Sequence, residues 1–125
     1  MLESPLPTPR EMEILKVLWD HGPCSVREVY RRMSQHEELA YNTVQTMLRI
    51  MEDKGLVRHA VTGRAFVYTA VYTREASVRG FLDRVFDGAA DELVLTLLRS
   101  ERISHLELDK LHGMIQEARR RKGAR

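Results

Sequence analysis

The sequence predicts a mainly α-helical protein with one small β-hairpin. Three observations support this fold class. Helix-capping motifs recur along the chain, and apolar residues return every three to four positions on both sides of a short central segment. Within that segment the pattern changes to short runs rich in valine, phenylalanine and tyrosine. The length of 125 residues fits one domain, or one domain with an added oligomerisation segment.

Two capping boxes, each a hydroxyl residue followed three positions later by glutamate, begin the first two predicted helices. The box at 8–11 (TPRE) begins a helix that runs to about Trp19, and the box at 25–28 (SVRE) begins a shorter helix through Met33. The segment 20–23 (DHGP) separates them. We expect the first helix to bury Met12, Leu15, Leu18 and Trp19.

The third predicted helix lies in the segment 39–57 (LAYNTVQTMLRIMEDKGLV) and ends at Gly55. Its apolar side consists of Val44, Met47, Leu48 and Met51, at the spacing of one buried stripe. The opposite side carries Asn42, Gln45, Thr46, Arg49 and Asp53, with Thr43 at its edge. Because threonine is a mediocre helix former, two threonines on this side indicate a purpose other than helix stability.

A β-hairpin follows, with strands predicted at 56–61 and 65–71 and with Gly63 in the turn between them. Three helices followed by a hairpin is the order of a winged helix-turn-helix DNA-binding domain, which we assign to residues 1–72. Arg64, beside the turn glycine, would then reach a phosphate or the minor groove.

From residue 73 the pattern is helical again, with helices expected at about 73–86, at 92–98 and from a third capping box at 104–107 (SHLE). Three short helices form too thin a layer to cover their own apolar sides, so we expect a homodimer. Residues 73–125 are therefore predicted to be a helical dimerisation domain that ends in a basic tail (RRRKGAR). The expected interface residues are Phe81, Leu82, Val85, Phe86, Leu111 and Ile115.

The distribution of charge favours double-stranded DNA as the partner. The net charge of +2 is too small to indicate a polyanion by itself. However, residues 1–38 hold five basic and seven acidic side chains, whereas residues 39–72 hold four basic and two acidic ones. Amides suit adenine edges, hydroxyls suit bases or phosphates, and arginine suits guanine or phosphate. The expected DNA-binding residues are Asn42, Thr43, Gln45, Thr46, Arg49 and Arg64.

Several other classes of protein do not fit the sequence. It has no phosphate-binding glycine loop and no G-x-S-x-G motif, so an enzyme is not expected. A single cysteine, Cys24, excludes an intrachain disulfide, and its H-x-x-C spacing from His21 lacks a second ligand pair, so no metal or cofactor is expected. The chain has no apolar run of membrane-spanning length and no signal peptide, so we expect a cytoplasmic protein without membrane insertion.

Three segments resemble the BlaI/MecI-type penicillinase repressor family: EMEILKVLW at 11–19, TVQTMLRIMEDKGLV at 43–57 and GRAFVYTA at 63–70. The segment 92–111 (ELVLTLLRSERISHLELDKL) is similar as well. The resemblance implies a transcriptional repressor that binds a palindromic operator as a dimer. It also places Asn42, Thr43, Gln45 and Thr46 at positions that family members use at the operator.

This sequence departs from the family pattern at three places. The family often has arginine where this chain has Ile50 and a neutral residue where it has Arg49, which indicates that the arginine contact is shifted. Members cleaved downstream of a membrane-bound sensor metallopeptidase have Asn-Phe where this chain has Thr96 and Leu97, so a cut at that bond requires a different specificity. The copper-responsive branch has C-terminal Cys-x-Cys motifs, and this chain has no cysteine after Cys24.

Two alternatives remain open from the sequence. The first is a ligand-sensing winged-helix regulator with a pocket between its winged and helical parts. The second is a winged-helix module that binds proteins and no DNA.

Overall fold

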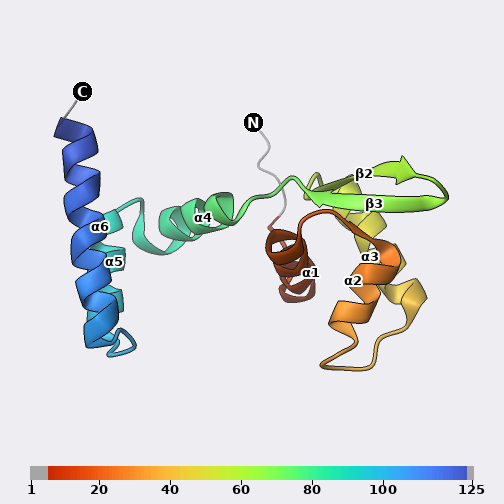
Figure 1. Cartoon of the computed structure of the whole chain (residues 1–125), viewed down its shortest axis with the longest axis horizontal. Helices are drawn as coiled ribbons and strands as arrows, with labels where there is room; N and C mark the ends of the chain where they lie inside the picture. The colour runs from red at the N-terminus through yellow and green to blue at the C-terminus, as the bar shows by residue number, and fades with distance from the viewer. Residues whose placement is uncertain (1–5, 124–125) are drawn as a thin grey trace. The chain divides into compact units, whose positions relative to one another are not determined.

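The computed structural model describes residues 6–123, which contain six α-helices and three β-strands (Figure 1). In chain order these are α1 (Pro9–His21), β1 (Cys24–Ser25), α2 (Val26–Met33), α3 (Tyr41–Asp53), β2 (Val57–Thr62), β3 (Ala65–Ala70), α4 (Arg74–Phe86), α5 (Ala90–Arg99) and α6 (His105–Gly123). This arrangement confirms the predicted fold class.

The chain divides into two compact units, one that ends at Val78 and one that begins at Arg79. The predicted domain boundary between residues 72 and 73 stays a prediction. The last two residues of the predicted basic tail lie outside the described part.

The three predicted capping boxes are present. The Thr8 hydroxyl accepts a hydrogen bond from the Glu11 backbone N–H at 3.2 Å, and the Glu11 carboxylate accepts one from the Thr8 N–H at 2.9 Å. Ser25 with Glu28, and Ser104 with Glu107, form the same reciprocal pairs. Each box satisfies two backbone donors that a helix start would leave unpaired. These helices therefore begin where the local sequence predicts.

The sheet has the strand order β1-β3-β2, with both pairings antiparallel. Strands β2 and β3 form the predicted hairpin, whose register runs from Val57 opposite Ala70 to Thr62 opposite Ala65. Gly63 has a φ of 64°, a left-handed conformation that glycine adopts without strain. The two-residue strand β1 was not predicted, because so short a strand has no alternation to recognise.

Helices α1, α2 and α3 and the sheet enclose one apolar core. Ile14, Leu15, Leu48 and Met51 are among its fully buried side chains. The predicted inward side of α1 is partly wrong, since Met12 and Trp19 are only partly buried and Ile14 is fully buried. The inward stripe is 11, 14, 15 and 18, and its first position is Glu11, which a search for apolar residues does not count.

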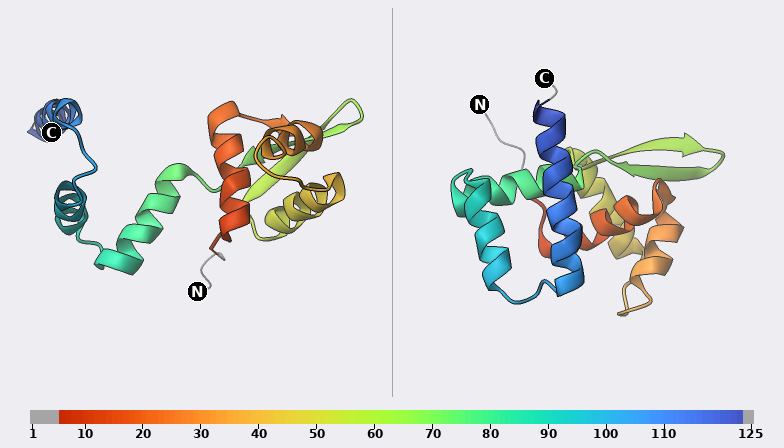
Figure 2. Two further views of the ribbon diagram at one scale, coloured as in Figure 1. Left: turned by 90° about the horizontal axis from the view of Figure 1, so that it is seen from below. Right: turned by 60° about the vertical axis from the view of Figure 1, so that its left-hand side comes forward.

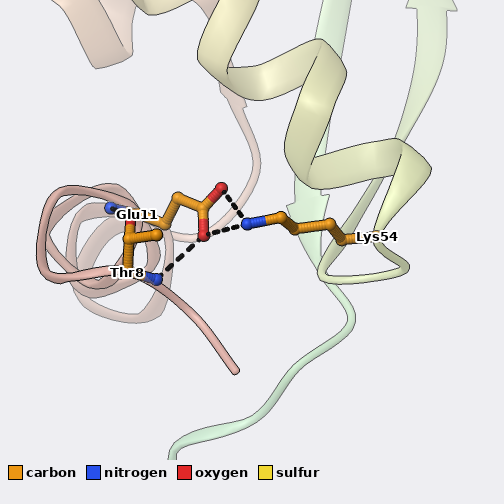
Figure 3. Close-up of polar contacts among 3 residues, drawn as sticks. All are labelled: Thr8, Glu11 and Lys54. Atoms are coloured by element: carbon orange, nitrogen blue, oxygen red, sulfur yellow. Dashed lines mark hydrogen bonds and ion pairs between the residues drawn. The ribbon is translucent and has the colours of Figure 1, made fainter. Parts of the chain in front are cut away.

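Glu11 is a buried carboxylate that joins α1 to the end of α3 (Figure 3). The residue is 5% exposed in the fold, and the Lys54 Nζ lies 2.9 Å from both of its carboxylate oxygens. Burial by itself would raise the pKa of Glu11. The hydrogen bonds from Thr8 and the ion pair with Lys54 outweigh burial and hold this pKa below its usual value. The pair therefore fixes the C-terminal end of α3 against the first turn of α1.

Trp19 contacts the segment that connects β3 to α4. Its indole N–H donates a hydrogen bond to the Tyr72 carbonyl oxygen at 2.9 Å. The Arg74 guanidinium lies 5.2 Å from the centre of the indole ring and also pairs with Asp20 at 3.1 Å. The connecting segment is thereby attached to α1 at the point where α4 begins.

The second unit has a different character. Figure 2 shows α5 and α6 running in opposite directions, joined by a loop at one end. Every residue between 79 and 123 is at least partly exposed. Its exposed large apolar side chains are Phe81, Val85, Val94, Leu95, Leu97, Leu98, Leu106, Leu108, Leu111, Met114 and Ile115. Among the described residues, no helix is long and apolar enough to cross a membrane.

Candidate nucleic-acid interface

Helix α3 divides into a buried side and an exposed polar side. Val44, Leu48 and Met51 are completely buried in the core. The helix positions that the sequence analysis assigned to DNA are all exposed; they are Asn42, Thr43, Gln45, Thr46 and Arg49. The apolar side is thus used for packing, and the polar side is free for a partner.

The exposed side carries two parallel rows of side chains, each at i, i+3 and i+7. One row consists of Asn42, Gln45 and Arg49, which bear amides and a guanidinium. The other consists of Thr43, Thr46 and Ile50, which all end in methyl groups. Residues three and four positions apart are neighbours on a helix surface, so each row is continuous.

An open groove of about 460 Å³ runs between α3, the start of α2 and the hairpin. It is lined by Ser25, Val26, Arg27, Tyr41, Gln45, Arg49, Arg64, Ala65, Phe66 and Tyr68. The structure therefore brings together three of the predicted residues, Gln45, Arg49 and Arg64. Asn42, Thr43 and Thr46 do not line the groove and lie on the open surface of α3 beside it.

The groove is positively charged. Three arginines, Arg27, Arg49 and Arg64, line it, and no acidic side chain is among its lining residues. The Arg27 guanidinium lies 5.7 Å from the centre of the Tyr41 ring, a cation–π contact that directs this charge towards the groove wall. Three guanidinium groups around one groove suit the phosphates of a nucleic acid backbone.

A contact between Glu52 and His59 fixes the hairpin against α3. The Nδ1 atom of His59 lies 2.6 Å from Glu52 Oε1, and the His59 backbone N–H donates to Glu52 Oε2 at 3.2 Å. The His59 ring stacks on Phe66 with centroids 4.2 Å apart. Because Phe66 lines the groove, this cluster sets the distance between the hairpin and the polar side of α3.

Sequence reasoning did not identify Arg27, Glu52 or His59 as parts of this site. Arg27 occupies the first turn of α2, and helix-turn-helix order alone could have indicated that this turn approaches the same partner as α3. The Glu52–His59 contact had no such signal, because it depends on the packing of the hairpin.

The histidine and cysteine with metal-like spacing differ in burial, since Cys24 is buried and His21 is exposed. Cys24 is 2% exposed within the core, its thiol lies 3.3 Å from the Gly22 carbonyl oxygen, and burial raises its pKa. His21 Nε2 instead lies 3.2 Å from Arg32 Nη1. Cys24 is therefore a protonated packing residue.

The residues predicted for dimerisation lie on α4 and α6. Phe81 and Val85 are 43% and 54% exposed, while Leu82 and Phe86 are half-buried. Leu111 and Ile115 on α6 are 36% and 55% exposed. Thr96 and Leu97 are exposed on α5, where the Thr96 hydroxyl donates to the Glu92 carbonyl oxygen at 2.8 Å.

Comparison with known proteins agrees with this geometry. The family model described as "Penicillinase repressor" matches residues 7–117. A penicillinase repressor from Bacillus licheniformis is 31% identical to the chain over 126 aligned positions, which cover 98% of each protein.

Two solved structures align with the N-terminal part. One is the DNA-binding domain of the repressor BlaI, with 33% identity and a TM-score of 0.54. The other is the monomeric form of BlaI from Bacillus licheniformis in complex with the blaP half-operator, with 33% identity and a TM-score of 0.52. Each covers 61% of this chain and 93% of the solved chain.

Proposed function

The chain belongs to the penicillinase repressor family, a family of transcriptional repressors and not of enzymes, and we propose that it binds a palindromic operator as a homodimer. The observation that supports this most is the exposed polar side of α3 beside a groove lined by three arginines. In this proposal the partner is double-stranded DNA, and the protein acts in the cytoplasm.

Each side chain of the interface has a role that its chemistry suits. Helix α3 enters the major groove, where the amides of Asn42 and Gln45 pair with adenine edges. Arg49 binds guanine or a phosphate, and Arg27 at the start of α2 binds a phosphate. Arg64 at the tip of the hairpin reaches the neighbouring phosphate or minor groove.

Dimerisation couples two such units. The uncovered apolar residues of α4 and α6, which include Phe81, Val85 and Ile115, bury one another against the same residues of a second chain. The two copies of α3 then reach half-sites roughly one helical turn of DNA, about 34 Å, apart.

Binding of the full chain to DNA from its own upstream region tests the proposal. We expect a complex with a footprint of two related half-sites, and a shuffled duplex of equal length as the control should bind far more weakly. Arg49→Ala should weaken this binding, whereas Arg79→Ala, a matched exposed arginine of the second unit, should not. Equal affinity for the two duplexes would contradict recognition of an operator, and no binding to either duplex would favour a module that binds proteins.

We further propose that repression ends by a cut between Thr96 and Leu97, downstream of a membrane-bound sensor metallopeptidase. Leu97 is 48% exposed, and α5 has no buried side chain, so unwinding of its last turns to present this bond costs little. The cut detaches α6 from the rest of the chain and weakens the dimer, which lowers operator occupancy by mass action.

Mass spectrometry of the repressor, co-expressed with the candidate sensor and its inducer, tests this step. A fragment that ends at Thr96 is the expected result. Intact protein that leaves its operator would contradict the proposal and indicate a bound ligand instead.

A further inference from the structure

Ile50 is a large apolar side chain on the side of α3 that faces away from the core. It is 45% exposed and is not one of the buried residues of the core cluster. A β-branched apolar residue at this place neither favours the helix nor contributes to the core. Its position therefore indicates a contact with something outside this chain.

The neighbours of Ile50 indicate the nature of that contact. Thr46 lies one turn before it and Thr43 two turns before it, so three methyl-bearing side chains form one exposed row. Arg49 is adjacent in the chain and lines the positively charged groove. A row that combines methyl groups with hydroxyls beside this much positive charge fits the floor of a DNA groove better than an apolar protein surface.

We infer that Ile50 packs on the C5 methyl group of a thymine in the major groove and makes the protein prefer an A·T pair at one position of each half-site. This inference rests on the proposed function. The thymine methyl is the apolar group that the major-groove edge of a base pair presents, and aliphatic side chains contact it without needing a hydrogen bond. The amides of Asn42 and Gln45 thus bind the polar edges of the bases, and Ile50 contacts the apolar methyl group of thymine.

The test removes single methyl groups from the DNA. The full-length protein first selects its preferred duplex from a randomised library at fixed salt. Each thymine of that duplex is then replaced, one at a time, by deoxyuridine, which lacks the methyl and keeps every hydrogen-bonding group. We expect one replacement per half-site to weaken binding about fourfold, the effect of exposing one buried methyl group, and the others to change little.

Protein variants assign that methyl to a side chain. Ile50→Ala changes both protomers of the dimer, so it should bind the unmodified duplex about as weakly as the wild type binds a duplex with the sensitive thymine replaced in both half-sites. The same deoxyuridine should then have no further effect on Ile50→Ala, because the interaction is already absent. Val71→Ala, a matched control with a 49% exposed valine away from α3, should keep the full fourfold sensitivity. Thermal unfolding should be unchanged in both variants.

Three results would overturn the inference. Deoxyuridine without effect at every position would remove thymine methyls from the readout, while selection of a defined duplex would still support the proposed function. A penalty that persists in Ile50→Ala but disappears in Thr46→Ser would assign the methyl contact to Thr46. Failure of the wild type to select any sequence would contradict the proposed function itself and this inference with it.

Discussion

The two units of the chain use their apolar residues in opposite ways. In the first unit, Leu15, Val29 and Leu48 come from three different helices and are completely buried against one another and the sheet. In the second unit, Phe81, Leu97 and Ile115 also come from three different helices but are at least 43% exposed. A large uncovered apolar surface on a folded protein usually marks an interaction site. The comparison teaches that the first unit buries its apolar residues within one chain, whereas the second leaves its apolar residues exposed, which is the basis of the proposed dimer.

The largest expected effect is on the proposed dimer interface of the second unit. Phe81→Asp places a charge in the proposed dimer interface, so the protein should become monomeric in light scattering. Operator affinity should fall by roughly 100-fold or more, because one linked binding event becomes two independent ones. Val71→Asp, which adds a charge at an equally exposed valine of the first unit, is the control and should stay dimeric. A dimer that survives Phe81→Asp would move the interface to another element, most simply to Leu111 and Ile115 on α6.

The next largest effect is expected for the polar side of α3 in the first unit. Gln45→Ala or Thr46→Ala should cost about 1–3 kcal/mol on the specific operator and little on random DNA, since these side chains read bases. Fluorescence anisotropy with both duplexes measures the difference. Gln116→Ala, an exposed glutamine of the second unit, should change neither. Equal losses of affinity on the two duplexes would show that Gln45 and Thr46 contact only phosphates.

A third experiment compares ion pairs in the two units. Glu11→Gln leaves the partly buried Lys54 without its counter-charge and should lower the free energy of unfolding by about 1–2 kcal/mol at pH 7. Glu117→Gln breaks the exposed pair with Arg120 and should cost less than about 0.5 kcal/mol. Denaturant unfolding measures both, and similar costs would mean that burial does not distinguish these pairs.

The same pair makes stability depend on pH. The pKa of Glu11 is lowered in the fold, so its contribution is complete above the unfolded value of about 4.3 and is lost as the pH falls through the folded value. The wild type and Glu11→Gln should therefore differ at pH 7, and the difference should disappear as the pH falls below the folded pKa of Glu11. A constant difference across this range would exclude the ionised carboxylate as the cause.

The smallest effect is expected at the hairpin tip. Arg64→Ala should weaken binding to all sequences alike and lower the slope of log K against log salt by about one, because one phosphate contact disappears. Arg84→Ala on α4 serves as the matched exposed control. An unchanged slope would place Arg64 away from the phosphates.

The sequence predicted those features that depend on residues close together in the chain. The capping boxes at Thr8, Ser25 and Ser104 need only a partner three residues later, and all three are present. The exposed side of α3 follows from helical periodicity alone. By contrast, the burial of Glu11 depends on Lys54, 43 residues away, and β1 exists only because it pairs with β3.

The candidate site was likewise predictable only where it depends on residues close together in the chain. The exposure of Gln45 and Thr46 follows from the periodicity of one helix, but the groove that Arg27 lines depends on how α2 packs against the hairpin. In the proposed dimer a second chain covers the second unit, so neither periodicity nor the fold of one chain identifies which of its apolar residues meet.

Because Trp19 contacts Tyr72, its fluorescence reports on the segment that connects β3 to α4. Trp19 is the single tryptophan of the chain, so its emission comes from one place. The indole N–H is held by the Tyr72 carbonyl, and the ring lies beneath the Arg74 guanidinium. Release of the connecting segment would expose the indole to water and shift its fluorescence to longer wavelength. Steady-state emission can therefore follow, without any attached dye, whether operator binding or a cut in α5 disturbs the start of α4.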